Sequence, residues 1–146
     1  MCQTILINGL SIIDHCVTSP ISNALVRRII PALVNVVVRQ SAPITYGDLA
    51  IMIHHDTPRL GYQLGCIVDI LECLSANIGE RIPSITAICV NAHSGLPGAS
   101  FDRVHPDFPN LPYNEKINAL NDYIGSIYAF EGWMQVLSYL GLDYDY

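Results

Sequence analysis

Positive charge is scarce in this chain. Its 146 residues include 7 Lys and Arg against 13 Asp and Glu, which gives a formal net charge of −6, and Lys116 is the single lysine. Proteins that hold nucleic acid by neutralising its phosphates usually carry a basic face. The composition therefore weighs heavily against simple DNA binding.

Recognisable metal and cofactor motifs are also lacking. The five cysteines show no Cys-x-x-Cys spacing, no His-Glu-x-x-His occurs, and no glycine-rich loop leads from a strand into a helix. An odd number of cysteines without a secretory signal is typical of reduced thiols in a cytosol. We expect no metal, no cofactor and a cytoplasmic location.

Uncharged surface, by contrast, is plentiful. Apolar residues reach 51% and charged residues only 14%, against an average of about 25% charged. A protein partner or a second copy of the chain is expected to cover part of that surface. No run of 18 apolar residues occurs, so we expect no transmembrane helix and no membrane partner. The acidic residues concentrate in 104–146, where they could shield a basic surface, mimic phosphates or simply keep the chain soluble.

The middle of the chain carries the signals of two helices joined by a tight turn. Thr45 is a good N-cap, and Asp48 three residues later completes a capping box, so a first helix should run to about His54. Pro58 suits the first position of a second helix over 58–77, whose apolar residues recur at spacings of three and four. This pattern predicts a helix–turn–helix.

The segments before the predicted helix–turn–helix have less regular patterns of apolar residues. Residues 2–18 fit neither a helix nor a strand well, and Asn8-Gly9 could form a turn. After the cap cluster at Ser19-Pro20, residues 24–40 fit a long helix. Pro31 falls inside it, so we expect a kink or a break there, with two helices as the alternative.

The segments after the predicted helix–turn–helix are expected to form strands, then a loop and then helices. The run 85–91 is β-rich and apolar at nearly every position, which is typical of a strand covered on both faces, and a second strand or wing is expected near 96–101. A proline-rich loop should follow to Tyr113. Two helices, separated at Gly132 and ended by Gly141, complete the chain.

These elements predict a single domain over 1–146 that is α+β and mostly helical. It would consist of an N-terminal helical arm at 1–43, a winged-helix-like core at 44–101, and a loop with a C-terminal helical pair at 102–146.

The order Thr-Tyr-Gly-x-x-Ala at 45–50, Leu-Gly at 64–65 and Ile-Pro at 82–83 resembles the C-terminal winged-helix domain of alkylguanine-DNA alkyltransferases and their non-catalytic alkyltransferase-like relatives. The resemblance covers roughly residues 44–98 and implies that Tyr46 contacts a DNA phosphate.

Two functional positions of that family differ here. Tyr62 stands where the family has a helix arginine that replaces a flipped base, with Arg59 one turn earlier, and Ser84 stands at the catalytic cysteine. A serine hydroxyl ionises far less readily than a thiol, so the resemblance does not extend to alkyl transfer.

Candidate residues for contacting nucleic acid or a protein partner are Tyr46, Arg59, Tyr62, His93 and Arg103. We expect a non-catalytic interaction module on a winged-helix scaffold, acting through protein–protein contacts. It would suit an accessory or inhibitory subunit of a DNA-processing, defence or phage counter-defence system. A direct DNA-binding, alkyltransferase-like protein is the alternative from the resemblance.

A hydrolytic site is the alternative from the loop 92–107, which holds two serines, two histidines and two aspartates. A small hydrolase would require His93, His105 and Asp102 to converge on a pocket. No nucleophile elbow accompanies them, and ordinary turn chemistry accounts for these residue types in a loop, so enzymatic activity is the less favoured interpretation.

Overall fold

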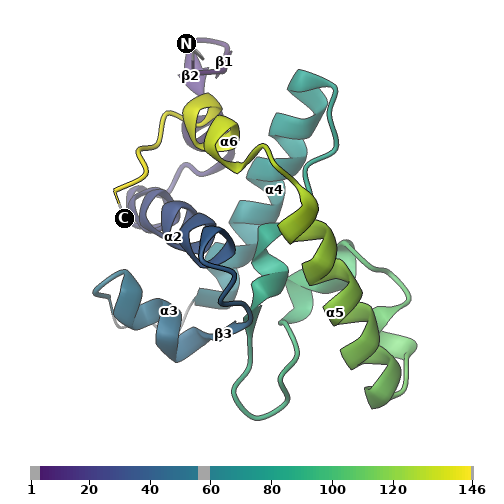
Figure 1. Ribbon diagram of the computed structural model, residues 1–146. Coiled ribbons are helices and arrows are strands. Elements are labelled where there is room, and N and C mark those ends of the chain that lie inside the picture. The colour runs from purple at the N-terminus through teal and green to yellow at the C-terminus, as the bar shows by residue number, and fades with distance from the viewer. Residues whose placement is uncertain (1–3, 56–59, 146) are drawn as a thin grey trace.

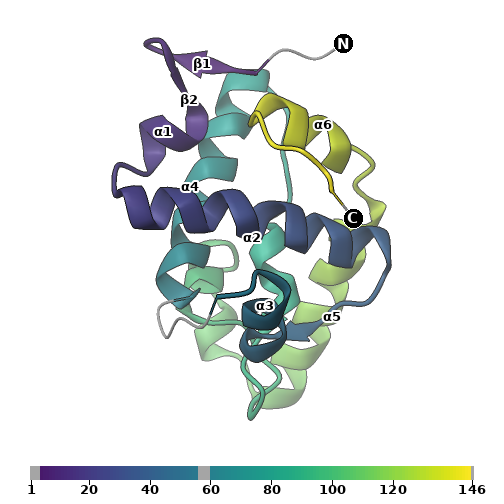
Figure 2. The same cartoon turned by 90° about the vertical axis from the view of Figure 1, so that its left-hand side faces the viewer.

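The fold is mostly helical and contains two small two-stranded sheets (Figure 1). The computed structural model describes residues 4–55 and 60–145. Helix α2 lies across α4, with α6 and the C-terminal segment on one side of α2 and α3 on the other (Figure 2). In chain order the elements are β1 (Leu6–Ile7), β2 (Leu10–Ser11), α1 (Ile12–Cys16), α2 (Pro20–Val38), β3 (Ile44–Thr45), α3 (Tyr46–Met52), α4 (Leu60–Ile78), η1 (Ile85–Ile88), β4 (Cys89–Val90), η2 (Ala99–Arg103), η3 (Phe108–Asn110), α5 (Tyr113–Ala129) and α6 (Trp133–Tyr139).

A small hairpin starts the described chain. Strands β1 and β2 pair antiparallel, and the turn between them places Asn8 at φ 51 and Gly9 at φ 83. Two successive positive φ angles suit the two-residue turns that match strand twist, which is why Asn-Gly is favoured there. The N–H of Ile5 donates to the carbonyl of Tyr139 over 2.9 Å, which attaches the hairpin to α6.

Helix α2 begins at Ser19, the N-cap, and runs without a break through Pro31. A break at Pro31, and the alternative of two helices, are therefore wrong. The missing N–H of a proline removes one intrahelical hydrogen bond, but Pro31 is buried within a helix whose middle is almost wholly packed in the core. Among the described residues, α2 is the helix long and apolar enough to cross a membrane, and 67% of its apolar window is packed inside the fold.

The strand predicted over 85–91 is wrong over its first half. Residues Ile85–Ile88 form the 3₁₀ helix η1, and only Cys89–Val90 form a strand, which pairs parallel with β3. Every residue of η1 is buried. A segment covered on all sides is apolar at every position whatever its backbone, so the pattern could not distinguish the two conformations.

The wing predicted near 96–101 is not a strand either. Residues Ala99–Arg103 form η2, and a turn at 91–95 is closed by the N–H of Gly95 donating to the carbonyl of Asn91 over 2.8 Å. Pro97 and Gly98, placed between the turn and η2, are poor strand residues, and Pro97 has no N–H to donate to a ladder.

The C-terminal helical pair is confirmed. Helix α5 begins at Tyr113, and α6 follows Gly132, its N-cap. Gly141 lies just beyond the last helix at φ 71, the left-handed conformation in which glycine ends a helix without strain. One cluster of buried apolar side chains joins α1, α2, α4, η1, α5 and α6, so the three predicted segments share a core.

Candidate functional site

The start of α3 is fixed by a capping box. The N–H of Asp48 donates to the Thr45 hydroxyl over 3.1 Å, and the N–H of Thr45 donates to the Asp48 carboxylate over 3.1 Å. These two bonds satisfy backbone donors that a helix start otherwise leaves unpaired. The predicted cap is confirmed, and it makes Tyr46 the first residue of α3.

Tyr46 packs beneath the turn that follows β4. Its side chain is half-buried, and a Cβ at Gly98 would lie 2.6 Å from the Tyr46 hydroxyl oxygen, so only glycine allows this approach. Burial, together with the neighbouring Cys89, raises the pKa of Tyr46, and a hydrogen bond with the Gly98 backbone opposes the rise. Tyr46 is therefore a neutral hydrogen-bonding anchor between α3 and the turn.

Large apolar side chains are exposed on both helices of the motif. Ile51 on α3 is 74% exposed, and Tyr62 in the first turn of α4 is 54% exposed. The candidate Arg59 lies outside the described residues. The burial of such side chains by a partner would remove apolar surface from water, which is a favourable contribution to association.

Arg103 is engaged by the middle of α4. Its guanidinium forms ion pairs with Asp69 at 2.7 Å and with Glu72 at 3.1 Å. These carboxylates, Asp69 first, raise the pKa of Arg103. The exposed face of α4 after Tyr62 thus carries two carboxylates, Asp69 and Glu72, and the single positive charge of Arg103 offsets only one of them. The remaining negative charge disfavours contact with a phosphate backbone.

The three candidate catalytic side chains do not gather around one hollow. Asp102 lines a hollow of about 360 Å³ between the 94–99 segment and Lys116, and neither histidine lines it. His93 is exposed on the turn, where its N–H donates to Asn91 Oδ1 over 2.8 Å.

His105 has a different environment. Its ring packs against Phe101 and Phe108 with centroids 6.1 and 5.9 Å apart, and its Nδ1 is buried without a hydrogen-bond partner. An imidazole surrounded by aromatic rings lacks the oriented carboxylate that a general base needs. The arrangement gives no support to a catalytic triad in this loop.

Ser84 lies in a hollow that the sequence did not indicate. About 280 Å³ is enclosed between α4, the 81–84 segment, Val104 and Tyr123. The N–H of Ser84 donates to the Tyr123 hydroxyl over 2.7 Å, and its own hydroxyl shares a 2.9 Å hydrogen bond with Thr86. A threonine is no base, so this serine is not activated as a nucleophile.

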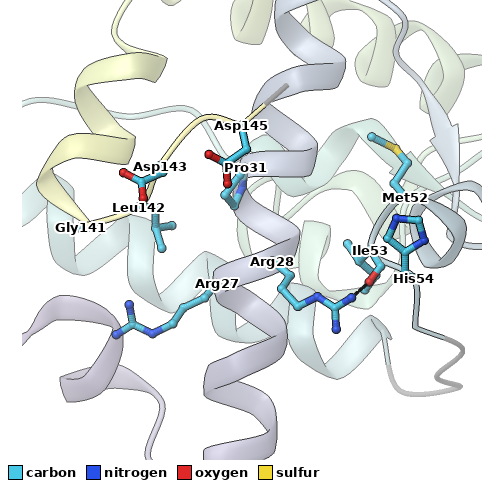
Figure 3. A pocket seen from close by; sticks show the side chains of 10 residues that line it. All are labelled: Arg27, Arg28, Pro31, Met52, Ile53, His54, Gly141, Leu142, Asp143 and Asp145. Atoms are coloured by element: carbon cyan, nitrogen blue, oxygen red, sulfur yellow. Dashed lines mark hydrogen bonds between the residues drawn. The ribbon is translucent and has the colours of Figure 1, made fainter.

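A second unpredicted feature is a cleft of about 470 Å³ on the outer side of α2 (Figure 3). Arg27 and Arg28 lie on α2, His54 follows α3, and Asp143 and Asp145 belong to the C-terminal segment that crosses α2. The arginine pair was visible in the sequence as a local excess of positive charge. Its juxtaposition with the acidic C-terminal end was not, because that contact spans more than a hundred residues.

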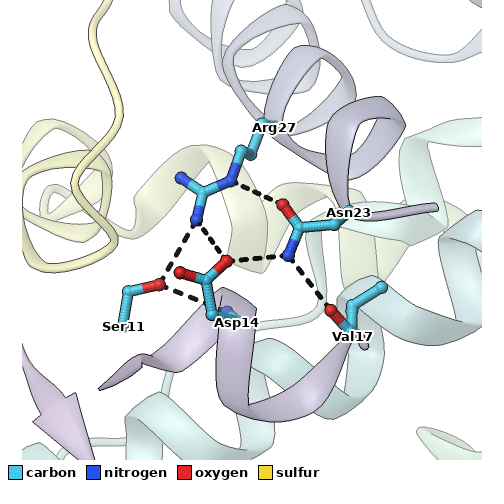
Figure 4. A network of polar contacts seen from close by, with 5 residues as sticks. All are labelled: Ser11, Asp14, Val17, Asn23 and Arg27. Carbon is cyan, nitrogen blue, oxygen red and sulfur yellow. Dashed lines mark hydrogen bonds and ion pairs between the residues drawn. The ribbon is translucent and has the colours of Figure 1, made fainter. Parts of the chain in front are cut away.

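Arg27 is held by a polar network beside this cleft (Figure 4). Its guanidinium donates to Asp14 over 2.8 Å, to Asn23 over 2.8 Å and to Ser11 over 3.3 Å. The Arg27 hydrogen bond, and then that of Asn23, lowers the pKa of Asp14. The network ties α1 to α2 and compensates the charge of Arg27.

Metal ligation finds no support in the part of the chain that the structure describes. No group of three or more His, Cys, Asp or Glu side chains there is arranged to hold an ion. Cys16 on α1 lies beside Cys73 on α4, and burial raises the pKa of Cys16 to about 12. Such a thiol is protonated at neutral pH and is a poor metal ligand and nucleophile.

No family model matches this chain, and no curated protein and no solved structure is significantly similar to it.

Proposed function

We propose that this protein is a non-catalytic interaction module on a winged-helix scaffold and that it acts through contacts with protein. The scaffold is supported by two successive helices, the capped α3 and α4, and by the short parallel pair of β3, directly before α3, and β4, after α4. Such a scaffold would resemble that of the non-catalytic alkyltransferase-like proteins, in keeping with Ser84 at the position of the catalytic cysteine.

The observation that carries the proposal is the character of the motif's surface. Ile51 and Tyr62 expose large apolar side chains, whereas Arg103, which lies against α4, is paired with Asp69 and Glu72. Exposed apolar anchors are typical of protein interfaces. A DNA-reading helix would instead keep its arginines available for phosphates and base edges.

Self-association is the direct test of this surface. We expect size exclusion with light scattering to give a mass that rises with protein concentration above 16.1 kDa, the mass of one chain. Ile51→Asp should return the protein to a monomer because it places a charge in the apolar contact. Leu6→Asp, at a residue 60% exposed on the N-terminal hairpin, is the matched control and should leave the mass unchanged.

Direct DNA binding makes the opposite prediction. A monomer that shifts a short duplex in a salt-sensitive manner would overturn the protein-contact proposal and favour the alkyltransferase-like alternative. In that case Tyr62→Ala should reduce the shift, since an exposed aromatic ring at the start of the second helix is suited to stacking.

A further inference from the structure

The face of α2 that bears its arginines is covered by the chain's own acidic end. Arg28, Asn35 and Arg39 recur at spacings of seven and four, which places them on one side of the helix. The segment after Gly141 crosses this side and ends beside the C-terminal half of α2 (Figures 2 and 3). We call residues 142–145 the acidic strap and this side of α2 the arginine face.

One buried side chain anchors the strap. The Tyr144 hydroxyl donates to Asn35 Oδ1 over 2.9 Å, and Arg39 Nε donates to the same oxygen over 3.1 Å. Asn35 is only 7% exposed. The Asn35 amide oxygen thus accepts from both a tyrosine and an arginine, and Arg39 holds it in place for a hydroxyl from the strap.

The charges of the strap and of the arginine face are complementary but are not in ion-pair contact. Asp143 and Asp145 line the cleft of about 470 Å³ opposite Arg28. Arg28 donates to the carbonyl of Ile53, and among the residues that the structure describes it pairs with no carboxylate. Its charge therefore attracts the strap across the cleft without fixing it.

We propose that the arginine face is a docking site for an extended, acidic, tyrosine-bearing peptide segment of a partner protein, and that the acidic strap occupies this site as an intramolecular competitor. The strap defines the chemistry of the ligand: a tyrosine for Asn35 and flanking carboxylates for Arg28. Neither Ile51 nor Tyr62 lines this cleft, so the inference does not depend on the function proposed above.

A peptide fits this site better than a nucleic acid does. Recognition depends on a hydroxyl reaching a buried side-chain amide, which a phosphate cannot replace because it has no hydrogen to donate to Asn35. Of the two arginines that line the cleft, Arg28 is the one without an ion-pair partner among the described residues, and one such cation releases too few counterions for tight phosphate binding in a chain of net charge −6.

The competition explains how the site would be regulated. A short linker gives an attached segment an effective concentration on the order of millimolar. A free peptide of equal intrinsic affinity therefore displaces the strap of the wild-type protein only when its own concentration exceeds that value. A partner that offers the same groups with additional contacts would displace the strap.

A titration tests the proposal on the 146-residue chain. The probe is a synthetic peptide with the sequence of residues 141–146, Gly-Leu-Asp-Tyr-Asp-Tyr. It is added to the wild type and to Asp143→Asn/Tyr144→Phe/Asp145→Asn, and backbone amide shifts are followed by NMR. The triple variant should bind at least about tenfold more tightly than the wild type because its own strap competes less, and the largest shifts should lie on α2.

Two controls separate a specific site from charge attraction. In the triple variant, Arg28→Gln should abolish peptide binding, whereas Arg103→Gln, at an arginine paired with α4, should not. A peptide with phenylalanine for both tyrosines should bind more weakly. Equal affinity of the wild type and the triple variant, binding that survives Arg28→Gln, or stronger Arg28-dependent binding of a short duplex than of the peptide would each overturn the proposal. The amide spectrum itself reports whether each variant is folded.

Discussion

The hydroxyl of Tyr123 on α5 accepts the backbone N–H of Ser84 over 2.7 Å. It thereby joins the last long helix to the segment that precedes η1. Burial raises the pKa of Tyr123, and the Ser84 hydrogen bond opposes that rise. The contact closes one side of the hollow around Ser84, so the hydroxyl supports both the packing of α5 and the shape of the hollow.

Tyr123→Phe should lower the free energy of unfolding by about 0.5–1.5 kcal/mol, because it leaves the Ser84 N–H without its partner. Tyr113→Phe is the matched control: its hydroxyl donates to the Ser94 carbonyl at an exposed position, where water can replace it. Urea denaturation followed by circular dichroism measures both. Equal losses in the two variants would contradict this account.

Thr45→Ala should destabilise the protein by about 1 kcal/mol, since it removes the side-chain acceptor of the α3 capping box. Thr18→Ala, at an exposed residue that caps no helix, should change the stability little. The two thermal melting temperatures give the comparison. A Thr45 variant as stable as the Thr18 variant would mean that packing alone maintains α3.

Asp14 should make stability depend on acid. The Arg27 hydrogen bond holds the folded-state pKa of Asp14 below its ordinary value of 3.8. Its stabilising contribution is therefore complete above that value and is lost as the pH falls through the folded-state pKa. Asp14→Asn should be less stable than the wild type near neutrality, and the difference should shrink in strong acid. A difference independent of pH would show that the network does not act through the carboxylate charge.

Cys89 should resist thiol reagents in the folded protein. Burial, and secondarily the charge of Asp48, raises the pKa of Cys89 to about 12 from 9.0. Iodoacetamide followed by mass spectrometry should label it slowly in the native state and rapidly in urea. Because the unfolded thiol ionises first, stability should also decline as the pH rises above about 9, and Cys89→Ala should show a shallower decline. Rapid native labelling would contradict the burial.

Local signals in the sequence predicted most helices correctly. The cap at Thr45, the start of α5 near Tyr113 and the end of α6 before Gly141 all agree with the structure. Each depends on hydrogen bonds or φ angles within a few residues, which the residue types themselves dictate. The mostly helical class follows from the same signals.

Two of the three errors occurred where burial is complete. Every residue of segment 85–88 is buried, and so is every residue of α2 from Ile29 to Val37. Periodicity identifies an element only when one face meets water, and therefore it could not separate a strand from a 3₁₀ helix in the core. For Pro31, the packing of the buried middle of α2 outweighed the lost hydrogen bond.

The features of the candidate sites likewise divide into those set by neighbouring residues and those set by tertiary packing. The sequence by itself determined the composition, the scarcity of positive charge, the helical periodicity and the cap of α3, because these are properties of single residues and near neighbours. Only the tertiary structure decided that Arg103 is neutralised by α4, that Tyr46 is covered by the turn at Gly98, and that Tyr144 meets Asn35. Those contacts join residues distant in the chain, and their partners are selected by how the helices pack rather than by any local pattern.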